Sequence, residues 1–258
     1  MKSKIQFGTK EIEFRIEFRN RRTISVSVEP PKNILVVAPM NTSEDEIKEI
    51  VKSKGAWIVQ KLFEFRHIEE KKVKREFVNG ESFMYLGRNY SLQIHVDKTL
   101  QNNSFVKLFR GKFHVYVKEK NDEIIKKAME EWYREKTEEQ VAKRIKYYQK
   151  FFNKKPTDIK VKEQKKRWAS CTSKDELLFN WRCVMAKSTA LDYIIVHEMC
   201  HMYHMNHSHE FWQLLSSVMS DYEVRKDWLR DYGIRMDLWY RMEKILWWII
   251  RKWMLIKI

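Results

Sequence analysis

VHEMCHMYHMNHSHEF, residues 196–211, contains five of the eight histidines of this 258-residue chain. Apolar residues precede it at helical spacing, among them Ile194 and Ile195, and Ser188 or Thr189 can cap the start of a helix. We therefore expect a helix that begins near residue 188 and carries the first of these histidines.

His197 and His201 are four residues apart. An α-helix turns by about 400° over four residues, so both imidazoles project from one face and can share a metal ion. Glu198 lies one step round the same turn, where it can act as a general base on a metal-bound water. The HExxH spacing predicts one zinc ion per chain and a hydrolase, because zinc lowers the pKa of bound water from about 15.7 to about 7.

A catalytic zinc site needs a third protein ligand and an open fourth position. The candidates are His204, His207, His209 and Glu210. In a continuous helix His204 would lie about 10.5 Å along the axis from His197, too far for both to bind one ion. His207 can join the site only if the helix ends before it, and Asn206 and Ser208 are residues suited to ending one helix and capping the next. We expect His207 as the third ligand, with His204 and His209 outside the metal site.

Strand and helix patterns alternate over the rest of the chain. Residues 5–40 predict a β-hairpin with the strands TISVSVEP and ILVVAP, and residues 42–71 predict one or two helices that begin at Thr42 or Ser43. Residues 76–118 return to strand character, and a long helix follows from Asp122 to about Asn153. The fold class predicted is α+β, with a β-rich N-terminal half that contains a helical insertion.

The second half is predicted to be mainly helical around a small β-hairpin. Residues 158–183 form its two strands, DIKVKEQ and ELLFNWRCV. We expect two regions, 1–120 and 121–258, packed as one unit because no flexible linker separates them. The last fourteen residues, ILWWIIRKWMLIKI, are too short to span a bilayer and predict a packed helix, with a helix on a membrane surface as the alternative.

Composition limits the compartment and the partners. The net charge of +16 and pI near 9.6 favour polyanions such as nucleic acid or nucleotides, although acidic residues are mixed among the basic clusters, as on an ordinary solvated surface. Three cysteines without a C-x-x-C pair and the absence of an apolar leader indicate a cytoplasmic protein. The sequence does not predict an oligomeric state.

The histidine stretch, with Asn206-His207-Ser208 and Phe211-Trp212 after the HExxH motif, resembles the YgjP-like metal-dependent hydrolases, which are related to SprT-like and other zincin metallopeptidases. The resemblance extends to RTISVSV, GESFMYLGRNYSL, RWASC and LFNWR. It implies a zincin-like metal-binding half in which His197, His201 and His207 hold the metal and Glu198 is the catalytic acid and base. Ala169 departs from the pattern R-W-G-S-C.

Arg167 of the RWASC segment has two interpretations. As a planar cation it can stabilise a developing oxyanion or hold a substrate phosphate, which would make it catalytic, or it can form a structural ion pair. Cys171 is disfavoured as a nucleophile or ligand because no partner lies at a suitable spacing.

Three functions are compatible with these residues. The first, which we favour, is a zinc metallopeptidase whose peptide or protein substrate adds to a sheet edge near residues 176–183. The second is a nucleoside triphosphate pyrophosphohydrolase that holds its substrate with Lys165, Lys166 and Arg167. The third is a non-enzymatic nucleic-acid or protein-binding module with a structural metal, which Glu198 argues against because structural zinc sites need no neighbouring carboxylate.

Overall fold

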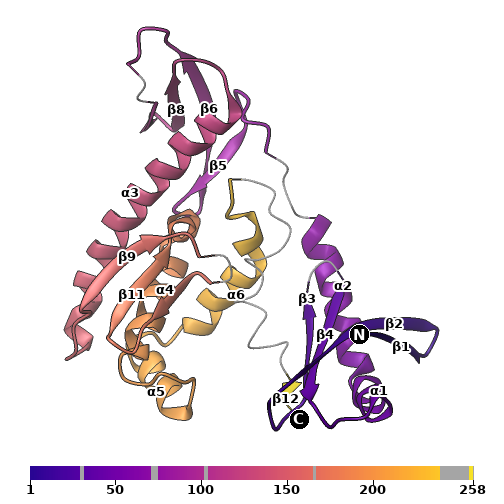
Figure 1. Ribbon diagram of the computed structural model, residues 1–258. Helices are drawn as coiled ribbons and strands as arrows, with labels where there is room; N and C mark the ends of the chain where they lie inside the picture. Colours follow the sequence, from indigo (N-terminus) through magenta and orange to yellow (C-terminus); the bar gives the residue numbers. More distant parts are fainter. Residues whose placement is uncertain (30–31, 71–74, 102–103, 165–166, 239–255, 258) are drawn as a thin grey trace. The chain divides into compact units, whose positions relative to one another are not determined.

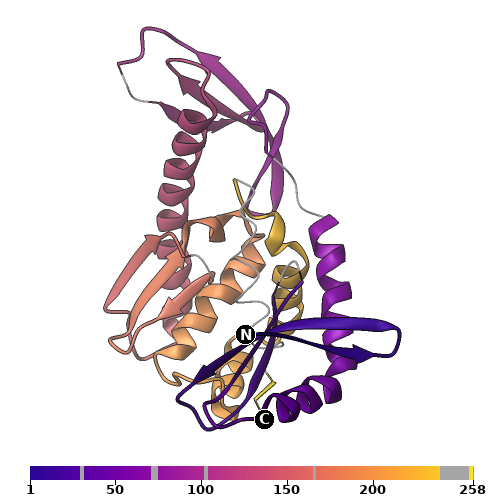
Figure 2. The same ribbon diagram turned by 45° about the vertical axis from the view of Figure 1, so that its right-hand side comes forward.

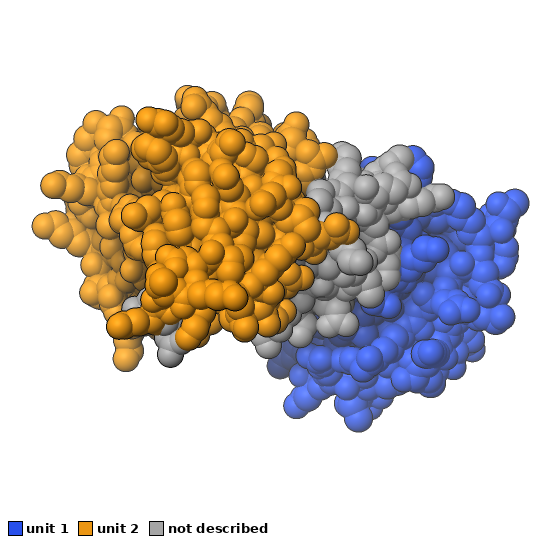
Figure 3. Space-filling view, turned by 90° about the horizontal axis from the view of Figure 1, so that it is seen from above, with its two compact units in different colours: residues 1–72, 241–258 blue, residues 73–240 orange. Residues whose placement is uncertain are grey.

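The computed structural model describes residues 1–29, 32–70, 75–101, 104–164, 167–238 and 256–257. Within these ranges the chain forms six α-helices and three small sheets, which confirms the α+β class (Figure 1). The chain divides into two compact units, residues 1–72 with 241–258 and residues 73–240 (Figure 3). The expected regions 1–120 and 121–258 follow a different division, which stays a prediction.

The first unit is a five-stranded sheet with two helices packed on it. Its strand order is β1-β2-β4-β3-β12, with β2 and β4 parallel and the other neighbours antiparallel. The elements are β1 (Lys2–Phe7), β2 (Lys10–Arg19), β3 (Ser25–Glu29), β4 (Asn33–Pro39), α1 (Glu44–Ser53), α2 (Gly55–Glu70) and β12 (Ile256–Lys257). The predicted hairpin of TISVSVEP and ILVVAP is confirmed as β3 and β4.

Alternating apolar residues build the core of this unit. Its buried members in β2, β3, β4 and both helices include Ile12, Phe14, Ile16, Val26, Val28, Val36, Ile47, Val51 and Ile58. Ser43 caps α1, because its side chain accepts a hydrogen bond from the Glu46 N–H at 3.2 Å. Gly55 begins α2 beside Phe7, and a Cβ there would lie 2.1 Å from the phenyl ring, so the close packing requires glycine.

The second unit begins with a four-stranded sheet on a long helix. The elements are β5 (Ser82–Tyr85), β6 (Arg88–Val96), β7 (Phe105–Phe109), β8 (Lys112–Val117) and α3 (Asp122–Tyr148), with strand order β5-β6-β8-β7. Figures 1 and 2 show this sheet at one end of α3. Asn121 caps α3, and the Tyr133 hydroxyl donates to the Met84 carbonyl at 2.7 Å, so the helix is tied to the sheet.

The turn between β5 and β6 contacts the segment that leads to the next helix. Leu86 and Gly87 have φ of 48° and 77°, the conformation of a two-residue hairpin turn. Their N–H groups donate to the carbonyls of Val184 at 2.8 Å and Met185 at 3.1 Å. The turn therefore packs against the chain just before α4.

A three-stranded sheet and three helices complete the second unit at the other end of α3 (Figures 1 and 2). The elements are β9 (Asp158–Lys162), β10 (Ala169–Cys171), β11 (Glu176–Asn180), the 3₁₀ helix η2 (Trp181–Met185), α4 (Ser188–His201), α5 (His209–Val218), α6 (Tyr222–Tyr232) and the 3₁₀ turn η3 (Gly233–Arg235). The predicted long helix stops earlier than expected, at Tyr148, and continues as a 3₁₀ turn, η1 (Gln149–Phe151).

Three predictions about residues 158–183 are wrong. The two predicted strands do not form a hairpin, because β9 and β11 pair in parallel. The second strand ends at Asn180, and residues 181–185 form η2 instead, with Arg182 buried against Glu163 and Asp237. The strand at 176–180 is also no edge, since the sheet order β10-β11-β9 places it in the middle. The joining segment contains β10, a strand that the sequence did not predict.

The predicted C-terminal helix at residues 245–258 lies outside the described residues, apart from Ile256–Lys257, which form the strand β12 rather than a helix. The basic residues Lys165 and Lys166 also lie outside them. In the described part of the chain, no helix combines the length and apolarity needed to cross a membrane.

Candidate metal centre

Helix α4 carries the first two histidines and is buried from Ala190 to Cys200. A helix that is apolar on all sides is typical of a protein core. It begins at Ser188 with Lys187 at its N-cap, so the predicted caps Ser188 and Thr189 are wrong. Because the lysine side chain has no acceptor, the first turn is closed by its backbone carbonyl, which accepts from Ala190 at 2.9 Å.

An ion-pair network holds α4 against its neighbours. The Arg144 guanidinium of α3 donates to both oxygens of Asp192, at 2.5 and 2.6 Å. The Tyr148 hydroxyl donates to the same carboxylate at 3.0 Å, and Arg225 of α6 lies 3.8 Å away. Bidentate pairs of this kind fix geometry, so the network positions the helix one turn before the first histidine.

His197, His201 and His207 converge. Each offers a nitrogen, and the three nitrogens lie within 4.8 Å of one another. The Nε2 atoms of His197 and His207 are 3.0 Å apart. The ring centroids are separated by 4.7 to 4.9 Å. A single ion among these nitrogens would reach all three with small movements of the rings.

The chain reverses between His201 and His207, as the spacing required. Helix α4 ends at His201, and the Met202 N–H bonds back to the carbonyls of Met199 and Cys200. Ser208 is the N-cap of α5, as predicted. The predicted left-handed conformation of Asn206 is not found, since this residue is not among the described residues with positive φ. Helix α4 ends instead in the tight turn at Met202.

Further contacts orient the rings. His201 Nδ1 lies 2.9 Å from the His204 carbonyl, and because a carbonyl only accepts, Nδ1 carries the proton and Nε2 keeps its lone pair. The centroid of the Phe211 ring lies 4.7 to 4.9 Å from the centroids of all three imidazoles. The Trp212 ring stacks on His207 with a centroid separation of 5.6 Å. These residues form an aromatic support for the cluster.

Glu198 follows His197 on α4 and is 1% exposed. Burial raises the pKa of its carboxyl to about 8, and the positive charge of Arg167 and a hydrogen bond from the Cys171 backbone N–H oppose that rise. Within the part of the chain that is described, Arg167 is thus the charged side chain that acts on Glu198, and Cys171 of β10 is its backbone donor.

Strand β10 lies beside α4 and is the end strand of its sheet within the described residues. The Trp168 carbonyl accepts from Asn180, and the Thr172 N–H donates to Glu176. Hydrogen bonds in an antiparallel ladder alternate along each strand, so Ala169, one residue after Trp168, directs its backbone groups away from β11. Ala169 is 1% exposed and the Cys171 N–H is bonded to Glu198, so the unpaired side of β10 is largely buried.

Arg167, expected as catalytic or structural, has an exposed side chain and acts electrostatically on Glu198. Its carbonyl accepts from Asn180 at 3.1 Å, which fixes the backbone at the start of β10. Burial, with a further contribution from the charge of Glu198, raises the pKa of the Cys171 thiol to about 12, so this group is protonated at neutral pH and unsuited to act as a nucleophile.

The comparisons with known proteins agree with this geometry. The sequence model of the YgjP-like metallopeptidase domain matches residues 22–232, which include the whole histidine cluster. The chain belongs to the YgjP-like metallopeptidase family. No curated protein and no solved structure gives a significant match. Membership of the YgjP-like family supports a metal-dependent hydrolase, and the three histidines could hold its metal ion.

The donor set of this YgjP-like site suits zinc. Among the described residues the group holds three imidazole nitrogens and no fourth donor, a donor set that fits zinc with an open coordination position. The other candidates, His204, His209 and Glu210, are not members of the group found among the described residues.

Sequence reasoning missed two parts of the site. It treated residues 165–175 as a loop, because β10 spans only Ala169–Cys171 and such a short strand shows no alternation. It also assigned no role at the site to Phe211, although this ring contacts all three imidazoles. The position of Phe211 three residues after Ser208, in the first turn of α5, was the available signal.

Proposed function

We propose that this chain is a cytoplasmic zinc metallopeptidase in which His197, His201 and His207 hold one zinc ion. The observation that carries the proposal is the convergence of three histidine nitrogens within 4.8 Å of one another beside a carboxyl that is 1% exposed. Zinc supplies Lewis acidity at such a site, acidifying water and polarising a carbonyl group.

Glu198 is the general base and then the general acid. It takes a proton from the attacking water as the new carbon–oxygen bond forms, and it returns that proton to the leaving nitrogen as the peptide bond breaks. A group with a pKa near the working pH performs both transfers, and a metal cation bound beside Glu198 would offset the rise that burial gives to its pKa. Arg167 stabilises the negative charge that develops on the carbonyl oxygen.

The peptide substrate binds along β10. An extended peptide can add to an end strand through backbone hydrogen bonds, and β10 is the end strand of its sheet within the described residues, with Ser170 and Cys171 half-buried. This replaces the edge at residues 176–183 that the sequence suggested, since β11 is paired on both sides. Backbone recognition favours unfolded or extended segments over folded proteins.

Peptide cleavage by the zinc-loaded protein tests the proposal. We expect an unfolded protein substrate to be cleaved, and Glu198→Gln to lower kcat by about 10²- to 10⁴-fold while zinc stays bound. Glu210→Gln, the same change at an exposed residue of α5 outside the cluster, should keep full activity. An active Glu198→Gln protein would remove the general base from the account.

A nucleoside triphosphate pyrophosphohydrolase is the second candidate, favoured by the exposed Arg167 beside Glu198 and by the net charge of +16. The same activated water can attack phosphorus. Release of pyrophosphate from nucleoside triphosphates, with a KM that rises steeply with salt, would support it over the peptidase. A third candidate, a binding module with a structural metal, would hold zinc but show neither activity.

A further inference from the structure

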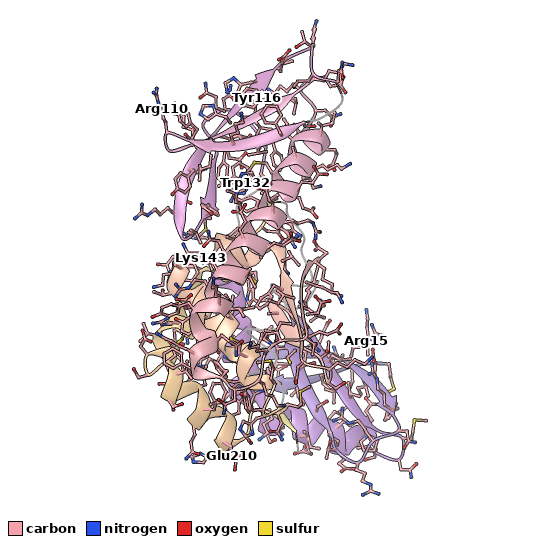
Figure 4. The ribbon with its side chains drawn as sticks, turned by 90° about the vertical axis from the view of Figure 1, so that its left-hand side faces the viewer. Arg15, Arg110, Tyr116, Trp132, Lys143 and Glu210 are labelled. Carbon is pink, nitrogen blue, oxygen red and sulfur yellow. The ribbon has the colours of Figure 1, made fainter. Side chains whose placement is uncertain are left out.

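The outward face of the four-stranded sheet carries a row of rings that the metal centre does not use. Inward-facing residues of β8 are fully buried toward α3: Phe113, Val115 and Val117. Lys112, His114 and Tyr116 alternate with them and face outward. Figure 4 shows Tyr116 in this sheet and Trp132 on the helix beside it.

Three of the outward rings are stacked across three strands. Tyr116 of β8 lies opposite Phe105 of β7 and His95 of β6, with centroids 4.6 Å away on both sides and interplanar angles of 15°. Phe105 is on the end strand and is 37% exposed, and Phe109 of the same strand is 57% exposed. The stack therefore ends on an exposed ring to which another flat ring can add.

The charge around these rings has one sign. Strands β6, β7 and β8 are described in full and contain no acidic residue. Lys107 Nζ lies 5.2 Å from the centroid of Phe105, and the Arg110 guanidinium lies 5.1 Å from that of Phe109. Lys112 faces outward from the neighbouring strand. Each exposed ring thus has a flexible cationic side chain over it, which a stacking base would displace toward its own phosphate.

We propose that this face binds single-stranded nucleic acid. Unpaired bases stack on Phe105 and Phe109, while phosphates contact Lys107, Arg110 and Lys112. A duplex offers no free base faces, and an anionic lipid surface offers no flat rings, so the exposed rings favour a single strand over both. Because stacking and phosphate contacts do not involve the ribose 2′-hydroxyl, DNA and RNA strands bind with similar affinity.

Fluorescence anisotropy with labelled twelve-nucleotide oligothymidine and oligouridine tests the stacking. The double variant Phe105→Ala/Phe109→Ala should raise Kd by about tenfold or more. Tyr147→Ala removes an aromatic side chain that is 50% exposed on α3 and should leave Kd unchanged. Phe105→Tyr keeps a flat ring and should also bind normally. Circular dichroism checks that each variant is folded.

A charge series tests the phosphate contacts. The triple variant of Lys107, Arg110 and Lys112 to alanine should reduce the slope of log K against log salt by about 2. The matched triple variant of Lys127, Lys143 and Lys146 changes the net charge equally from exposed positions on α3 and should keep the slope (Figure 4 labels Lys143).

Several results would overturn the proposal. They are no oligonucleotide binding by the parent at low salt, equal losses in the two triple variants, or binding to anionic vesicles with none to oligonucleotides. The measurement needs neither metal nor turnover, so its outcome is independent of the proposed peptidase activity.

Discussion

Replacing Gly87 with alanine should destabilise the second unit by loosening the turn that contacts the start of the metal helix. A Cβ at this position would lie 2.4 Å from Lys187 Cβ and 2.7 Å from Lys187 Cα, and the φ of 77° already disfavours alanine. The positive φ costs about 1 kcal/mol. The overlap would displace the turn and break its hydrogen bonds to Val184 and Met185, at about 1 kcal/mol each.

Gly87→Ala should therefore lower the free energy of unfolding by about 3 kcal/mol, which lowers Tm by about 9 °C in a unit of this size. Gly111→Ala is the matched control, since Gly111 occupies an equivalent turn with φ of 75° but nothing lies within 4 Å of its added Cβ. Gly111→Ala should lower the free energy of unfolding by about 1 kcal/mol and Tm by about 3 °C. Urea and thermal unfolding measure both. Equal destabilisation by the two substitutions would refute the reasoning.

Two other predictions concern the surroundings of the site. The pKa of the Cys171 thiol, raised by burial to about 12, keeps it protonated at pH 7.5, so iodoacetamide should modify it on the order of a hundredfold more slowly than free cysteine, with a rate that rises with pH. Peptide mass spectrometry follows this, and modification at the rate of free cysteine would contradict it. Asp237→Asn removes a partner from Arg182, which is 1% exposed and also paired with Glu163, so the free energy of unfolding should fall by about 3 kcal/mol. Urea unfolding measures this loss, and an unchanged midpoint would show that the pair does not stabilise the unit.

The local features of the metal site could be predicted because short-range geometry sets them. The four-residue spacing of His197 and His201 requires one helix face, and the reversal before His207 follows from Ser208 capping the next helix. Strands such as β3 and β4 were predictable because their apolar residues alternate.

The remaining features depend on contacts between distant segments. The position of β11 in the middle of its sheet follows from pairing with β9 and β10, and no pattern within residues 176–180 encodes that order. Arg182 continues an apolar run and looks like part of a strand, yet its pairing with Glu163 and Asp237 holds it in a 3₁₀ helix. The cap of α4 was mispredicted because Lys187 closes the first turn through its backbone alone.

The most direct test of the central claim is the zinc content of the purified protein, measured by elemental analysis beside His207→Ala and His209→Ala. The account predicts about one zinc per chain in the parent and in His209→Ala, whose side chain lies outside the cluster, and loss of zinc in His207→Ala. Zinc retained by His207→Ala, or no zinc in the parent after reconstitution, would contradict the three-histidine site.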